Sequence, residues 1–217
     1  ALRWDRDAAS ARGAHERIME LFLQGEAQVL IGTQMIAKGL HFPNVTLVGV
    51  LCADIGLFLP DFRAGERVFQ LLCQVAGRTG RGPLGGRVIV QTYTPHHYAV
   101  AAAAAQDYKS FYKSEMAYRQ EQELPPFGQL IHLVYLHTSQ VLCQREAIRW
   151  GGELKRQRDL WGLTNVDILG PAPAYPPRLR GRYRWHMILR GQDPRSLLDK
   201  MPMPRGWTVD VDPTSLT

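Results

Sequence analysis

Val29-Leu30-Ile31-Gly32-Thr33 is a short, continuous apolar run that ends in glycine and threonine. Such a run suits a strand buried on both faces of a parallel sheet. Two similar runs follow at residues 45–50 and 87–92, and helical patterns occur at residues 12–24 and 62–76. This alternation of strand and helix predicts a parallel α/β layer in the first half of the chain.

The second half of the chain has a different pattern. A long Ala-rich helix is expected at residues 96–120, and the break at Leu124-Pro125-Pro126-Phe127-Gly128 predicts domains at 1–122 and 123–217. The elements expected after the break are strands at 130–136, 166–169, 183–189 and 207–211, helices at 140–160 and 195–200, and a stiff Pro-rich loop at 171–177. This βαββαβ order predicts a small α+β domain of the ferredoxin-like kind.

Composition narrows the partners and the compartment. The 217 residues carry a net charge of +6, which favours an anionic partner, nucleic acid first and an anionic membrane surface second. No apolar run approaches the ~18 residues of a membrane span, and no signal peptide is visible. Cys52, Cys73 and Cys143 are scattered and form no CxxC pair, so we expect reduced thiols in a cytoplasmic protein and no metal site within this chain.

Two arginines next to glycines stand out in Gln74-Val75-Ala76-Gly77-Arg78-Thr79-Gly80-Arg81. Glycine allows close approach to a bulky anion, and the guanidinium fork matches phosphate oxygens. The pair suits a phosphoryl-transfer site, where an arginine offsets charge developing on the γ-phosphate. The alternative is a basic turn on a solvated surface.

A second candidate stretch runs from Ile31 to Pro43 and begins where the first predicted strand ends. Open α/β sheets bind ligands at this carboxyl edge. Thr33 can hydrogen-bond a phosphate, and Lys38-Gly39 adds a charge and a close backbone approach. Because the arginine pair follows one strand and one helix later, both stretches are expected to face one cleft. The alternative is an ordinary strand-to-helix loop.

These two stretches resemble motifs V and VI of superfamily 2 helicases. Further segments narrow the resemblance to the bacterial replication-restart helicase family, primosomal protein N′ (PriA). They are Pro60-Asp61-Phe62-Arg63-Ala64-Gly65-Glu66-Arg67, Phe69-Gln70-Leu71-Leu72, Pro125-Pro126-Phe127-Gly128, Gly181-Arg182-Tyr183-Arg184 and Asp210-Val211-Asp212-Pro213. The resemblance implies that 1–122 is a RecA-like helicase lobe and 123–217 a DNA- and partner-binding domain.

The resemblance also implies individual roles. Arg81 would be the finger arginine, Arg78 a second γ-phosphate ligand, and Gln74 would order the phosphate or the attacking water. The residues expected on the ATP side are Gly39, His41, Gly77, Arg78 and Arg81, and those on the DNA side are Thr33, Gln34 and Lys38. The family usually has Asp at the position of His41. A histidine can bond a ribose hydroxyl there but carries no fixed negative charge.

A row of arginines marks the C-terminal domain. Arg178, Arg180, Arg182 and Arg184 alternate along the sequence, so in one extended strand they would share a face and track a phosphate backbone. The alternative is a charged edge strand that avoids self-association. The resemblance supports DNA binding and also implies contact with the acidic tail of single-stranded DNA-binding protein, for which Arg195 is the candidate.

Several other polar residues and two tryptophans are expected to be structural. His96-His97 is interpreted as a helix entry rather than a metal pair. Asp61 is expected to pair with a neighbouring arginine, and Asp54, Asp210 and Asp212 are not assigned to a metal. Trp150 and Trp161 are expected in the core.

Taken together, these features predict part of an ATP-dependent 3′→5′ DNA helicase that restarts replication at abandoned forks. ATP and Mg²⁺ are the implied cofactors; branched and single-stranded DNA and other primosome proteins are the implied partners. The chain has no GxxxxGK[ST] loop and no acidic metal-binding box, so we expect it to be inactive alone. The family's zinc-binding Cys cluster is also outside this chain. The alternatives are a non-enzymatic nucleic-acid-binding module and lobe 2 of another superfamily 2 motor.

Overall fold

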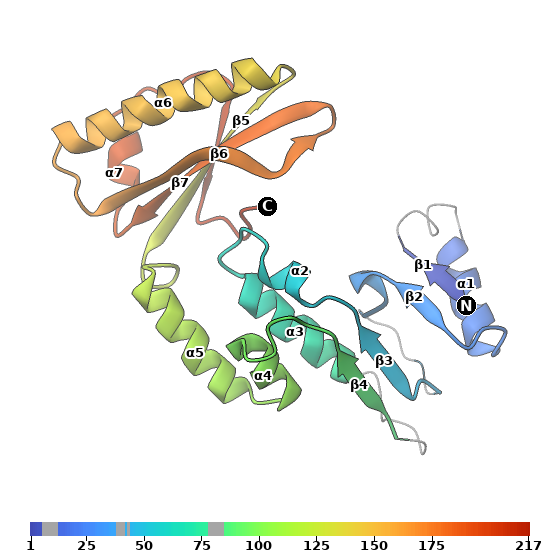
Figure 1. Ribbon diagram of the computed structural model, residues 1–217. Helices are drawn as coiled ribbons and strands as arrows, with labels where there is room; N and C mark the ends of the chain where they lie inside the picture. Colours follow the sequence, from blue (N-terminus) through green and yellow to red (C-terminus); the bar gives the residue numbers. More distant parts are fainter. Residues whose placement is uncertain (6–12, 38–41, 43, 78–84) are drawn as a thin grey trace. The chain divides into compact units, whose positions relative to one another are not determined.

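A computed structural model describes residues 1–5, 13–37, 42, 44–77 and 85–217 (Figure 1). Contacts divide the chain into two compact units. The N-terminal unit comprises Ala1–Leu57 and Gly65–Phe111, and the C-terminal unit comprises Phe58–Ala64 and Tyr112–Thr217. The short loop Phe58–Ala64 therefore belongs to the C-terminal unit, although the residues on either side of it belong to the N-terminal unit.

The N-terminal unit alternates strands and helices. Its elements are β1 (Leu2–Trp4), α1 (Ala14–Leu23), β2 (Leu30–Gly32), the 3₁₀ helix η1 (Gln34–Ala37), β3 (Leu47–Val50), α2 (Asp54–Leu57), α3 (Ala64–Ala76), β4 (Arg87–Val90), α4 (Tyr98–Ala104) and the start of α5 (Tyr108–Glu121). β1 pairs with β2 and β3 with β4, both in parallel. These pairs form two separate sheets instead of the single layer expected from the sequence.

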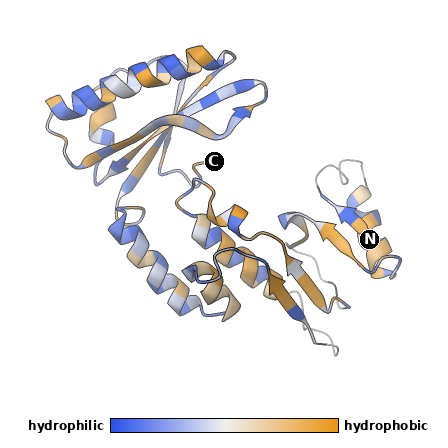
Figure 2. Cartoon of the chain, viewed as in Figure 1, coloured by the Kyte–Doolittle hydropathy of each residue, from blue (hydrophilic) through white to orange (hydrophobic). Residues whose placement is uncertain are grey.

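The sequence predicts strands that are covered on both faces, but β3 and β4 are covered on only one. Leu47 is 57% exposed and Ile89 is 60% exposed, although both lie in strands that are hydrophobic along much of their length (Figure 2). The alternate residues Val50 and Val90 pack against the helical core. Because side chains alternate across a strand, β3 and β4 bury one face and expose the other.

Aromatic and aliphatic side chains from α3, α4 and the start of α5 form the core of the N-terminal unit. Phe69 and Phe111 stack with ring centroids 4.0 Å apart, and Val68, Leu72 and Val100 are buried beside them. Figure 1 shows these helices on one side of β3 and β4. The apolar spacing of α3 that predicted a helix is thus the spacing that builds this core.

The long helix expected at residues 96–120 is wrong in one respect, because it consists of two helices. Gln106 has a φ of 52°, which ends α4. Asp107 then accepts hydrogen bonds from the backbone N–H and the hydroxyl of Ser110. An Asp at this position satisfies a free N–H group of a new first turn, so the chain restarts as α5.

The C-terminal unit has the predicted βαββαβ element order. Its elements after α5 are β5 (Gln129–His137), α6 (Gln140–Leu160), β6 (Val166–Leu179), β7 (Arg182–Gly191), α7 (Arg195–Leu198) and β8 (Trp207–Val211). The strands form one antiparallel sheet in the order β6-β7-β5-β8. Side chains of α6 and α7, including Trp150 and Leu197, pack with Leu133 and Met187 of the sheet in one core.

The Pro-rich stretch expected as a loop is part of β6. β6 pairs only with β7 and is an edge strand. Proline lacks an N–H group, so it is tolerated at an edge, where that group has no ladder partner. The pairing is nevertheless irregular, with register shifts between Leu169 and Ala172 and between Pro173 and Arg178.

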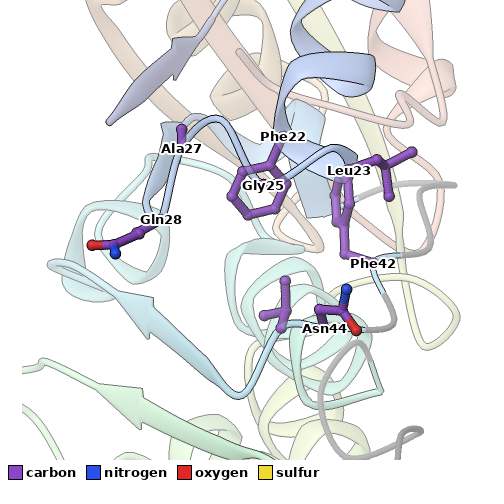
Figure 3. A pocket seen from close by; sticks show the side chains of 8 residues that line it. Phe22, Leu23, Gly25, Ala27, Gln28, Phe42 and Asn44 are labelled. Carbon is purple, nitrogen blue, oxygen red and sulfur yellow. The ribbon is translucent and has the colours of Figure 1, made fainter.

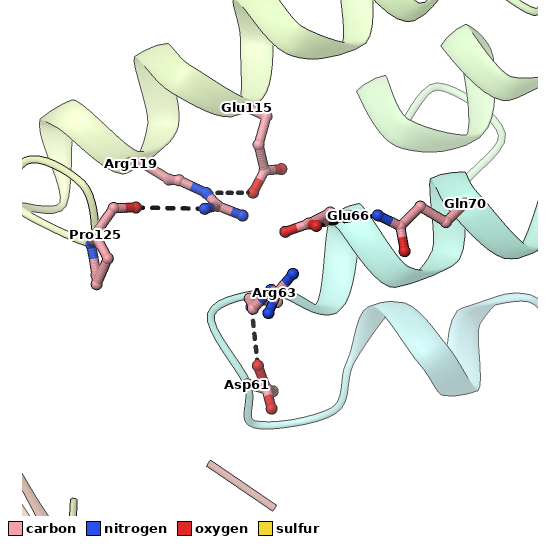
Figure 4. Close-up of polar contacts among 7 residues, drawn as sticks. All are labelled: Asp61, Arg63, Glu66, Gln70, Glu115, Arg119 and Pro125. Atoms are coloured by element: carbon pink, nitrogen blue, oxygen red, sulfur yellow. Dashed lines mark hydrogen bonds and ion pairs between the residues drawn. The ribbon is translucent and has the colours of Figure 1, made fainter. Parts of the chain in front are cut away.

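The end of α5 is fastened to the C-terminal unit. The Arg119 side chain forms an ion pair of 2.7 Å with Glu115 and donates to the Pro125 carbonyl at 3.3 Å (Figure 4). Arg190 of β7 donates to the Gln122 carbonyl at 3.0 Å. These bonds explain why the contacts assign residues from Tyr112 onward to this unit, whereas the boundary at 122/123 stays a prediction.

Among the described residues, no helix combines the length and the apolar character that a membrane span needs.

Candidate functional site

The end of α3 presents the described part of the arginine-containing stretch. Val75 is buried in the N-terminal unit, and Gln74 beside it is exposed. The Gly77 N–H donates to the Cys73 carbonyl at 3.0 Å, which closes the last turn. Arg78 and Arg81 lie outside the described residues. The helix therefore leaves Gln74 free to meet a ligand at the point where the Gly-Arg residues begin.

The second stretch begins at the carboxyl end of β2. Thr33 and Gln34 are exposed there, and the Thr33 carbonyl accepts from the Ile36 N–H at 3.1 Å, which opens η1. A Cβ on Gly32 would stand 2.2 Å from the Trp4 carbonyl oxygen. Only glycine therefore allows β1 to approach β2 this closely.

The described residues of these two stretches lie beside different sheets. Thr33 and Gln34 follow the β1-β2 sheet, whereas Gln74 ends a helix that packs beside the separate β3-β4 sheet. Lys38, Gly39 and His41 lie outside the described residues. The expectation of a shared cleft stays a prediction.

A buried carboxylate organises the carboxyl edge of β3 and β4. Asp54 accepts hydrogen bonds from the hydroxyls of Thr92 and Thr94, at 2.9 and 2.8 Å, and from the Tyr93 N–H. Burial raises the pKa of Asp54, but these hydrogen bonds outweigh it and hold the pKa below its usual value. Asp54 thus joins the start of α2 to the loop that follows β4. No cluster of metal-ligating side chains is found among the described residues.

A cavity of about 310 Å³ lies between the end of α1 and the segment before β3 (Figure 3). Its lining is Phe22, Leu23, Gly25, Ala27, Gln28, Phe42, Asn44 and Val45. Phe22 and Phe42 meet edge to face at 5.2 Å. Among the described lining residues, Gln28 and Asn44 are the polar ones and none is charged.

The four arginines of the C-terminal unit lie on a hairpin and do not form the single row expected. Arg180 and Gly181 have φ values of 48° and 82° and form the turn between β6 and β7. Across it Arg178 pairs with Tyr183, and Leu179 pairs with Arg182. Since cross-strand partners share a face, Arg178 lies on one face of the hairpin, and Arg182 and Arg184 lie on the other.

These arginines also differ in their contacts. Arg184 donates to the carbonyls of Tyr175 and Pro176 at 3.2 and 3.3 Å. The Arg178 guanidinium lies 5.3 Å from the centroid of the Tyr183 ring. Arg180 and Arg182 are exposed, and no described residue accepts a hydrogen bond from either side chain. Two arginines thus hold the hairpin, and two are available to a ligand.

The remaining candidates have structural or exposed positions. Arg195 is exposed at the start of α7. His97 caps α4 by accepting from the Ala99 N–H, as the helix-entry interpretation predicted. Trp150 is 1% exposed, as expected, but Trp161 is 36% exposed and lies under Lys200. Trp161 follows the last turn of α6, which explains why it is not in the core.

The sequence predicts a neighbouring arginine as the partner of Asp61 but gives no sign of its contacts with Ser215 and Leu216. This carboxylate is 8% exposed and accepts from the Arg63 N–H at 2.9 Å (Figure 4). It also accepts from the Ser215 hydroxyl at 2.8 Å and from the Leu216 N–H at 3.0 Å. The loop Phe58–Ala64 is therefore fastened to the end of the chain, a contact that no local sequence pattern signals.

Comparison with known protein families identifies the class. Residues 8–83 match the helicase conserved C-terminal domain, and residues 120–214 match the primosomal protein N C-terminal domain. The chain therefore has a helicase-type lobe followed by a domain found in primosomal protein N.

Several individual relatives match most of this chain. Replication restart protein PriA of Bacillus subtilis is 44% identical over 189 residues, which cover 87% of this chain and 23% of the relative. The PriA proteins of Chlamydia trachomatis and Treponema pallidum are 50% and 42% identical, over 87% and 97% of this chain and 25% and 33% of the relatives. The chain belongs to the replication restart protein PriA family and spans a third or less of the length of these relatives.

Proposed function

We propose that this chain is the second motor lobe and C-terminal domain of an ATP-dependent 3′→5′ DNA helicase that acts in replication restart. The observation that carries the proposal is the end of α3, where exposed Gln74 and the turn at Gly77 immediately precede Arg78 and Arg81. The matched helicase domain contains this segment. The proposed architecture is a RecA-like lobe followed by a ferredoxin-like domain, supported by the parallel strand pairs and by the order β6-β7-β5-β8.

ATP hydrolysis requires a second lobe that supplies the phosphate loop and the acidic residues for Mg²⁺. In this proposal Arg81 stabilises the charge that develops on the γ-phosphate, Arg78 binds the same phosphate, and Gln74 orders the attacking water. Gly39, His41 and Gly77 border the nucleotide. The family's zinc site lies in a part of the protein outside this chain.

DNA is proposed to contact both units. Thr33, Gln34 and Lys38 follow β2 and would hold the backbone of the translocated strand. Exposed Arg180 and Arg182 on the hairpin, with Arg178 and Arg184 supporting them, would bind branched DNA. Arg195 is the proposed contact for the acidic tail of single-stranded DNA-binding protein, because its guanidinium is exposed on α7.

Arg81→Ala in the complete protein tests the motor proposal. We expect DNA-stimulated ATP hydrolysis to fall by about 10³-fold or more, the range measured for finger arginines, with little change in DNA affinity. Arg87→Ala, an exposed arginine on β4, is the matched control and should retain activity. Full turnover in Arg81→Ala would exclude the finger role.

A second measurement separates the motor from a binding module. ATP hydrolysis is measured for this chain alone and for the chain joined to its upstream region. If the chain alone does not hydrolyse ATP and the joined protein does, the chain is one half of a motor. If neither protein hydrolyses ATP and both bind DNA, the non-enzymatic nucleic-acid-binding module would be favoured.

A further inference from the structure

The β6–β7 hairpin forms a narrow ribbon with a basic tip. The last β5 pair is His137 with Tyr183, so β5 does not accompany the hairpin beyond this position. The tip, residues 178–182, is therefore two strands wide, and Figure 1 shows it as the end of the β6–β7 ribbon. Its two-residue turn keeps the strands close together up to Arg180 and Gly181.

An irregular segment fixes the direction of this tip. Between the pairs Pro173–Trp185 and Arg178–Tyr183, residues 174–177 of β6 stand opposite Arg184 alone. Such a bulge bends a ribbon and increases its twist. The Arg184 side chain donates to the Tyr175 and Pro176 carbonyls, so it satisfies acceptors that the bulge removes from the strand ladder. Arg184 is thus a positioning residue for the tip.

The dimensions and charge of the tip fit one groove of duplex DNA. Paired strands lie ~4.8 Å apart, and a two-stranded ribbon fits the major groove, ~12 Å wide, but is too wide for the minor groove of ~6 Å. Arginine in the major groove can bind guanine O6 and N7 or the flanking phosphates. Arg180 and Arg182 are exposed at the tip and are suited to these contacts.

Single-stranded DNA fits this surface less well. Proteins bind single strands by stacking bases on exposed aromatic rings. The Tyr183 ring at the hairpin is covered on one side by the Arg178 guanidinium, 5.3 Å from the ring centroid, and its residue is only partly exposed. Tyr175 is 48% exposed, but it lies in the bulge before the tip. Residues 178–182 themselves contain no aromatic ring, so the tip offers charge and shape more than a stacking platform.

We propose that the β6–β7 hairpin inserts its tip into the major groove of the duplex part of branched DNA. Arg180 and Arg182 contact base edges or phosphates there, and Arg184 and Arg178 hold the ribbon in its shape. This proposal rests on the proposed DNA-binding function of the hairpin and names the form of DNA that it recognises.

The test uses the 217-residue chain and fluorescence anisotropy at low salt. The probes are a labelled duplex of two helical turns and one of its strands alone. The variants are Arg180→Ala/Arg182→Ala and the control Arg145→Ala, an exposed arginine on α6. We expect the double variant to bind the duplex at least about tenfold more weakly and the single strand less than about twofold more weakly, with unchanged circular dichroism. The control should match the unmodified chain.

Groove occupancy provides the second measurement. Methyl green, which occupies the major groove, should compete with the unmodified chain, and distamycin, which occupies the minor groove, should not. Equal losses for duplex and single strand in the double variant, or competition by distamycin alone, would overturn groove insertion while leaving DNA binding by the hairpin intact. Unchanged binding to both probes would overturn both, and the arginines would then serve to protect the sheet edge.

Discussion

His132 gives the C-terminal unit a predicted sensitivity to mild acid. Its neighbours Ile131 and Leu133 face the core shared with α6, so His132 lies on the opposite face of the sheet. It is 5% exposed, and its Nε2 lies 2.9 Å from Nδ1 of His186. Burial, followed by the charges of His186 and Arg184, lowers the pKa of His132 to about 4, although Asp210 and Asp61 act in the opposite direction.

The sign and size of the effect follow from proton linkage. At a pH of about 7.5, well above the ordinary histidine pKa of about 6.5, the histidine is largely neutral in both folded and unfolded chains. Between 6.5 and about 4 the unfolded chain binds a proton that the folded unit excludes, so stability falls as the pH falls. Lowering the pH from about 7.5 to about 5 should reduce the free energy of unfolding by about 2 kcal/mol through this residue.

Urea unfolding at the two pH values measures this loss. Trp150, Trp161, Trp185 and Trp207 all lie in the C-terminal unit, so tryptophan fluorescence reports mainly on its unfolding. His132→Gln should reduce the pH dependence by about 2 kcal/mol, and a part should remain, because burial also lowers the pKa of His186. Exposed His96→Gln in the N-terminal unit should leave the pH dependence unchanged. An identical pH dependence in His132→Gln and the unmodified chain would refute the assignment to His132.

Two further predictions concern packing. Gly32→Ala should accelerate hydrogen exchange in β1, because the added Cβ would stand 2.2 Å from the Trp4 carbonyl oxygen. Gly49→Ala is the control and should leave the exchange rates of β1 unchanged, since its Cβ meets nothing within 4 Å. Equal exchange rates in the two variants would contradict the close-approach argument. Trp150→Ala should lower the free energy of unfolding by about 3–5 kcal/mol. Trp161→Ala, at a 36% exposed residue, should lower it by less than about 1 kcal/mol. Urea unfolding measures both losses, and similar losses would contradict this difference.

Long, strongly patterned elements of the C-terminal unit were predictable from the sequence. The helix predicted at residues 140–160 and the strand predicted at residues 207–211 have the same bounds as α6 and β8. In α6, Ala147, Trp150 and Leu154 recur at helical spacing and are buried in the core. Where local spacing and tertiary burial agree in this way, the sequence alone is sufficient.

Elements that depend on neighbours were not predictable in the same way. The Pro-rich stretch forms a strand because β6 is at the sheet edge, and a sequence does not reveal which strand is at the edge. The arginine row was expected on one face because an extended strand was assumed. The turn at Arg180 and Gly181 instead places Arg178 and Arg182 on opposite faces.

Some residues of the candidate site were predictable from local motifs, and others were not. Local motifs identified Gln74 at the end of α3 and Thr33 after β2, and the structure leaves both exposed at the ends of their elements. The supporting role of Arg184 and the attachment of Asp61 to Ser215 and Leu216 were not predicted, because folding brings these partners near from other parts of the sequence, and most of them are backbone groups. Contacts with backbone atoms leave no residue-type signature in a sequence.

The attachment of Asp61 to Ser215 also has a consequence for biosynthesis. The two residues are 154 positions apart, and a ribosome adds them in that order. While α3 and α4 emerge and assemble their own core, the loop before α3 still lacks two of its hydrogen-bonding partners. Domains generally fold as units during synthesis, beginning at the N-terminus. This loop belongs to the C-terminal unit, so it completes its hydrogen bonds with that unit, only after Ser215 and Leu216 have left the exit tunnel, although the ribosome makes it early.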